Sequence, residues 1–229
     1  LPTQAQMDAL SFDRAYAINR EHFGNANGFT FVLVGAFDLD KAKALATRYI
    51  GGLPSDVSKT FNAVDTGMRP IKTSRRVDFS KGSEPKSTTL LKYTGEIEHY
   101  DLAEDFKLYL LEEVPKIKLT ESLREQLSGV YTVGVGSVYA RLPYPNYSIT
   151  LSIPSAPENV DALVAAAKKE IDALRRQGPS PADFAKVKEN YLTGLAIRQK
   201  ENSYWLGKLA QFDENGMDPA LIPDYNRRL

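Results

Sequence analysis

Alternation of apolar and polar residues predicts a β-hairpin in the second half of the chain. Residues 145–153 place four apolar side chains on one face and four polar ones on the other, which is typical of an antiparallel strand with one solvated face. Residues 131–140 alternate in the same way, and Gly134 and Gly136 leave one face nearly bare. The short loop 141–144 between these segments favours antiparallel pairing of the two.

Two further segments are predicted to be strands. Residues 29–37 carry apolar side chains on both faces, as in a central strand covered on two sides. Residues 87–97 form the other.

Helix signals separate these strands. Ser11 is expected to cap a helix that runs to Phe23, and Asp38 one that covers residues 39–49. Residues 100–127 are helical in pattern, and Pro115 is expected to kink or split this helix. Ser155 and Glu158 have the spacing of a capping box, which would open a helix ending at Gly178.

Two helices follow near the end of the chain. Ser180 and Pro181 are expected to open the first, and residues 204–212 form the second. The order of elements predicts an α+β fold, a two-layer sandwich of a largely antiparallel sheet and helices. We expect a single domain over residues 1–229, with 55–76 as an internal linker and 201–229 as a partly truncated C-terminal segment.

Composition narrows the chemistry. The chain has 29 Lys and Arg against 29 Asp and Glu and no cysteine, which excludes disulfides, thiolate nucleophiles and Cys-ligated zinc. A balanced charge argues against nucleic acid as a partner. Residues 69–92 hold seven basic and two acidic side chains. We interpret this run as a solvated face, and nucleic-acid binding is the alternative.

No targeting or membrane segment is evident. The longest apolar run, 29–37, is far shorter than the roughly 20 residues needed to span a bilayer. The first ten residues lack the layout of a signal peptide, and there is no initiator Met. The sequence is therefore expected to be a piece of a longer protein.

The two histidines do not form a zinc motif. In the inverted motif H-x-x-E-H a second histidine stands four residues before the last. For His22 and His99 those positions hold Ile18 and Gly95. Glu96 and His99 remain a possible two-point ligand. No G-x-S-x-G elbow is present either, so we expect no catalytic residue and no metal in this chain.

One stretch carries a family resemblance. In residues 122–137 (SLREQLSGVYTVGVGS), Arg124 precedes Tyr131 by seven positions, with Gly129 between them. This pattern resembles the C-terminal-type, non-zinc domains of the pitrilysin/insulinase family of zinc peptidases. Residues 16–50, 52–54 and 148–160 match as well, so the resemblance covers about residues 10–200.

The resemblance implies a role in substrate binding. In that family the zinc ligands belong to another domain, while the Arg and Tyr contact the main chain of the bound peptide. It implies that this chain is the metal-free, substrate-enclosing domain of a zinc-dependent metallopeptidase, inactive alone, with Arg124 and Tyr131 as substrate-binding residues. Zinc is then expected in the missing catalytic domain.

The resemblance also implies partners and a compartment. The expected partners are a peptide substrate and the catalytic half of the same protein or a partner subunit. The expected compartment is the bacterial periplasm or cell envelope. Two alternatives stay open: a scaffold domain of the same family, and a structural role in which Arg124 complements the helix dipole or pairs with Glu121 or Glu125 while Tyr131 packs in the core.

Overall fold

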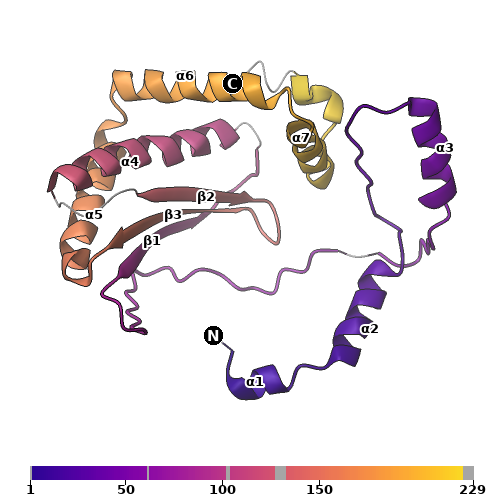
Figure 1. The fold of residues 1–229 in the computed structure, drawn as a ribbon, viewed down its shortest axis with the longest axis horizontal. Coiled ribbons are helices and arrows are strands. Elements are labelled where there is room, and N and C mark those ends of the chain that lie inside the picture. The colour runs from indigo at the N-terminus through magenta and orange to yellow at the C-terminus, as the bar shows by residue number, and fades with distance from the viewer. Residues whose placement is uncertain (1, 61, 102–103, 127–132, 224–229) are drawn as a thin grey trace. The chain divides into compact units, whose positions relative to one another are not determined.

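A computed structural model describes residues 2–60, 62–101, 104–126 and 133–223 of the chain (Figure 1). These residues form two compact units. The first comprises residues 1–63 with 201–219, and the second comprises residues 64–200 with 220–229. The junction between residues 63 and 64 falls inside the segment 55–76 that the sequence indicates as a linker.

The second unit is built on a three-stranded antiparallel sheet with the order β1-β3-β2. Its strands are β1 (Ser87–Glu96), β2 (Gly134–Ala140) and β3 (Asn146–Ser155). Ala140 lies opposite Asn146, so the hairpin predicted from the loop 141–144 is confirmed. Because β3 is central, its polar face is half-buried, not fully solvated as the alternation predicts.

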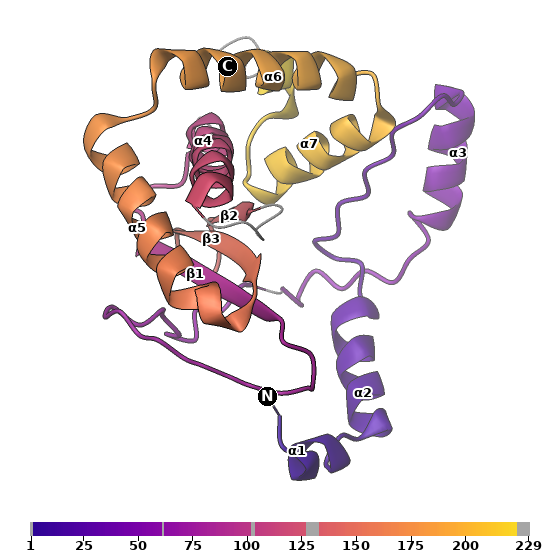
Figure 2. The same cartoon turned by 60° about the vertical axis from the view of Figure 1, so that its left-hand side comes forward.

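Helices cover one face of this sheet. The helices of the second unit are α4 (Glu104–Gln126), α5 (Val160–Gln177) and α6 (Pro181–Arg198). α4 packs on β2 and α5, while α6 packs on α4, as Figure 2 shows. The predicted α+β sandwich of helices and an antiparallel sheet is therefore confirmed.

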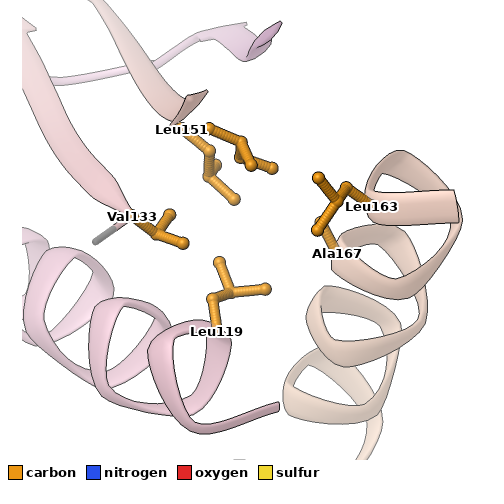
Figure 3. Packing of buried hydrophobic residues seen from close by; sticks show 6 residues of the cluster. Leu119, Val133, Leu151, Leu163 and Ala167 are labelled. Atoms are coloured by element: carbon orange, nitrogen blue, oxygen red, sulfur yellow. The ribbon is translucent and has the colours of Figure 1, made fainter. Parts of the chain in front are cut away.

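The core of the second unit lies between the sheet and these helices. Leu119 of α4, Leu163 and Ala167 of α5, and Leu151 of β3 are almost fully buried and point toward one another (Figure 3). Burial of each leucine side chain contributes roughly 1.5–3 kcal/mol. This cluster fixes α4 relative to the strand β2 that follows it.

Local capping signals mostly act as predicted. Ser180 Oγ accepts the Asp183 N–H at 3.1 Å and opens α6. Pro115 is buried inside α4, and the helix runs through it without being split. The prediction of a capping box at Ser155 is wrong. Ser155 pairs with Ser87 as the last residue of β3, and the short 3-10 turn η1 (Pro157–Asn159) precedes α5.

The first unit contains the helices α1 (Gln4–Asp8), α2 (Phe12–Phe23), α3 (Leu39–Tyr49) and α7 (Asn202–Glu214). Ser11 and Asp38 cap α2 and α3 as the sequence predicts, through the N–H groups of Arg14 and Lys41. The short turn η2 (Pro219–Leu221) follows α7 in the chain.

The prediction of a central strand at residues 29–37 is wrong. In the part of the chain that the structure describes, these residues pair with no other strand, and Figure 1 draws them as a thread between α2 and α3. A β-strand needs a neighbour to satisfy its backbone groups, and a pattern of apolar residues does not supply one.

Candidate substrate-contact site

The two predicted contact residues fall, along the sequence, in the last turns of α4 and between α4 and β2. The backbone of Arg124 belongs to the last turns of α4. Its side chain, and Tyr131 as a whole, lie outside the described residues. The geometry of the site therefore comes from the helix and the strand that bracket it.

A carboxylate fixes α4 to the outer edge of β2. Glu112 Oε1 accepts the backbone N–H of Ser137 at 2.6 Å. This N–H points away from β3, because antiparallel strands direct alternate N–H groups to opposite edges. The helix thus satisfies a group that would otherwise stay unpaired at a sheet edge, and a bond to an ionised acceptor is stronger than a neutral one.

The C-terminal half of α4 is tied to both other helices. Lys118 forms an ion pair with Asp183 of α6, with 2.9 Å between Nζ and Oδ2. Ser122 Oγ donates to Glu170 of α5 at 3.3 Å. Because Leu119 between them is fully buried, the helix end that carries Arg124 is held by packing and by polar contacts.

The Lys118–Asp183 pair shifts the pKa of each partner. The Lys118 ammonium, together with the Ser180 hydroxyl, lowers the pKa of the Asp183 carboxyl below its usual value. Hydrogen bonding to Asp183 raises the pKa of Lys118. Both groups stay charged near neutral pH, so the tie between α4 and α6 is present there.

The strand β2 presents an open face, as its alternation predicts. Gly134 and Gly136 are exposed, whereas Val135 packs against the core. A Cβ atom added at Gly136 would meet no atom within 4 Å. An extended chain can approach the strand closely at these two glycines, although Val138 on the same face is 57% exposed.

The described residues do not fit a zinc site. Among them, no group of three or more His, Asp or Glu side chains is placed to hold a metal ion. His22 lies in α2, and the exposed His99 stands 3.8 Å from Glu98 in the loop after β1.

The basic run at residues 69–92 is partly neutralised by its neighbours. Arg69 pairs with Asp65 at 2.6 Å and stacks on the ring of Tyr144, with 3.6 Å from Cζ to the ring centroid. Arg76 pairs with Asp78 and with Asp161 of α5. These contacts are those of a solvated, ion-paired surface.

Sequence reasoning missed the side chains that support the site. Glu112 was not singled out, although it stands seven residues before Leu119, so that both lie on the same helix face. A carboxylate in line with a core leucine is the signal that could have found it. Asp183 and Glu170 carry no comparable signal, because their partners lie far away in the sequence.

The second unit is therefore an antiparallel sheet with helices packed on it, and the described residues hold no cluster placed to bind a metal ion. Residues 10–191 match the model of the peptidase M16 inactive domain, so the chain belongs to that family.

Individual relatives are zinc proteases. The chain is 24% identical over 199 residues to a zinc protease PQQL-like protein of Arabidopsis thaliana, covering 82% of this chain and 21% of the relative. Its fold is similar to that of the periplasmic protease PqqL of Escherichia coli, with a TM-score of 0.80, 21% identity, and coverage of 100% of this chain and 25% of the other.

A second solved structure shows the same fold. A peptidase M16 inactive domain from Pseudomonas fluorescens superimposes with a TM-score of 0.74 at 15% identity, covering 98% of this chain and 52% of that one. The chain spans only about a fifth to a quarter of the length of the PqqL-type proteins. It is an inactive M16 domain of the kind found in zinc proteases.

None of the helices among the described residues combines the length and the apolar character that a membrane span requires.

Proposed function

We propose that this chain is the substrate-enclosing, metal-free domain of a zinc-dependent peptidase. Arg124 and Tyr131 contact the main chain of the bound peptide, and the zinc with its ligands lies in a part of the protein outside these 229 residues. One observation carries the proposal: α4 and β2, which precede and follow this Arg-Tyr segment, are fixed to each other. The hydrophobic core and the Glu112–Ser137 hydrogen bond hold them together.

The chemistry of the two side chains suits this role. A guanidinium offers five N–H donors in a fixed geometry, which suits the carbonyl groups of an extended peptide. A phenol can donate to an oxygen that gains negative charge during hydrolysis. Residues on rigid elements hold such donors in place better than residues on loops.

The relatives suggest where the protein works. A solved relative is described as a periplasmic protease, and we propose a bacterial periplasmic or envelope location for this protein too. We also propose that the catalytic half of the same protein, or a partner subunit, encloses the peptide together with this domain.

Photo-crosslinking tests the contact directly. A benzophenone amino acid replaces Tyr131 in the longest protein that the reading frame encodes, and a labelled peptide is added before irradiation. We expect transfer of the label to this position, and none from the same group placed at the exposed Tyr16 of α2. Absence of label at both positions, in a protein that still cleaves the peptide, would contradict the contact. A protein that neither cleaves the peptide nor takes up label would favour the scaffold role.

A further inference from the structure

Residues 30–36 form an irregular segment with an unpaired backbone, and the chain bends at Gly35 and Ala36. In the described part of the chain, no hydrogen bond reaches the N–H or C=O groups of these seven residues. Phe31 within the segment is 45% exposed, and the flanking Phe29 and Phe37 are 42% and 45% exposed. Exposed aromatic residues next to a row of free backbone groups are typical of a strand that lacks its neighbour.

The segment is held firmly at its base. The buried Asn25 accepts the Asp56 N–H at 2.7 Å and donates its amide to the Asp56 carbonyl at 3.2 Å. The Ala26 N–H donates to the Pro54 carbonyl at 2.8 Å. These bonds join the residues before the segment to those after α3, so the segment and the helix together form one closed loop of the chain.

Beside the segment lies an open apolar groove. It has a volume of about 460 Å³, and its apolar lining comes from the segment and from α3: Leu33, Phe37, Ala42, Leu45, Ala46 and Tyr49. No residue of α3 is buried, although its apolar residues share one face. The helix therefore covers the segment only in part, and the remaining surface is left to another occupant.

The chemistry of this surface selects a β-strand as the occupant. Only another extended backbone can satisfy a row of alternating N–H and C=O groups. A membrane surface fits poorly, because Asp38 offsets Lys41 at the groove, whereas membrane-surface helices are rich in basic residues. The relatives provide the source, since about four fifths of the Arabidopsis protein lies outside the matched region.

We propose that residues 30–36 add as a strand to a β-sheet supplied by polypeptide of the same protein outside these 229 residues, with α3 covering one face of the joint sheet. This docking is independent of the peptide contact proposed for Arg124 and Tyr131. The first unit would then share a β-sheet with polypeptide outside these 229 residues.

Hydrogen exchange tests the proposal on two proteins, the 229-residue chain alone and the longest product of its reading frame. We expect the amides of residues 31–36 to exchange at near-intrinsic rates in the chain alone, and roughly 100-fold or more slowly in the longer protein. Fast exchange in both proteins, or a reading frame that encodes no further sheet, would overturn the proposal. Slow exchange in the chain alone, together with a dimeric mass, would also overturn it and make a second copy the occupant.

A proline pair provides a matched control. Val32→Pro removes one N–H from the segment, and Val64→Pro makes the same change at an exposed, irregular position. We expect Val32→Pro to lower the melting temperature of the longer protein, while Val64→Pro does not, and neither to change that of the chain alone. Equal melting temperatures for the two variants in the longer protein would count against strand addition. The exchange experiment on the unmutated proteins decides the matter if Val32→Pro fails to fold.

Discussion

At the scale of single residues, long-range polar contacts hold the helix end that carries Arg124. The side chains of Lys118 and Asp183 are 32% and 13% exposed, so solvent screens this pair less than a surface ion pair. Glu112 and Glu170 reach β2 and α4 in the same way. Each partner lies 25 residues or more away in the sequence, which is why the sequence did not predict these contacts.

The pair predicts a pH-dependent loss of stability on mutation. The folded-state pKa of Asp183 lies below its value in the unfolded chain, so its stabilisation is complete above the unfolded value of 3.8 and is lost as pH falls through the folded value. We expect Asp183→Asn to cost about 1 kcal/mol at neutral pH, and this difference to shrink below about pH 4.

Urea unfolding of both proteins across this pH range measures the effect. Asp172→Asn is the control, because Asp172 is 54% exposed and stands 3.5 Å from Arg175 on the same helix. A cost for Asp183→Asn that stays constant down to pH 2, or that equals the cost at Asp172, would contradict this account.

At the scale of elements, the structure shows which patterns determine local structure. The caps Ser11, Asp38 and Ser180 were predicted correctly because a cap depends only on residues within one turn. Ser155 has the same local signal, but it is the last residue of the β1–β3 ladder. The strand predicted at residues 29–37 was wrong because a strand, unlike a cap, needs a distant partner. The described residues do not provide that partner.

The β1–β3 ladder predicts a pair of coupled mutations. Gly95 lies opposite Tyr147, and a Cβ at Gly95 would overlap the tyrosine ring. Gly95→Ala should therefore destabilise the second unit by about 1–3 kcal/mol, the cost of overpacking. In the Gly95→Ala, Tyr147→Ser double variant the cost of the alanine should largely disappear, because the ring is gone.

Thermal unfolding of the four proteins in this cycle measures the coupling. Gly136→Ala is the matched glycine control, since its Cβ would meet open space. Additive effects of the Gly95 and Tyr147 changes would show that the ring does not approach the glycine as the structure indicates.

At the scale of the whole molecule, sequence and structure together define an inactive M16 domain with a fixed α4–β2 support. The sequence predicted the fold class, because the hairpin and the helix stripes have strong periods, and it predicted the family through the resemblance of residues 122–137 and their flanking segments. It also pointed to Arg124 and Tyr131 as contact residues, and this assignment stays a prediction. The contacts that support them come only from the packed structure, since they join segments far apart in the chain.

The central claim concerns peptide turnover by the full-length protein. Its kcat/KM for a peptide substrate is compared with those of Arg124→Ala and Tyr131→Phe, and with two exposed controls, Arg176→Ala and Tyr16→Phe. The account predicts a fall of roughly 10² to 10³ if a donor to the developing negative charge is lost, with both controls unchanged. Unchanged turnover in both site variants would contradict the claim that this domain grips the peptide.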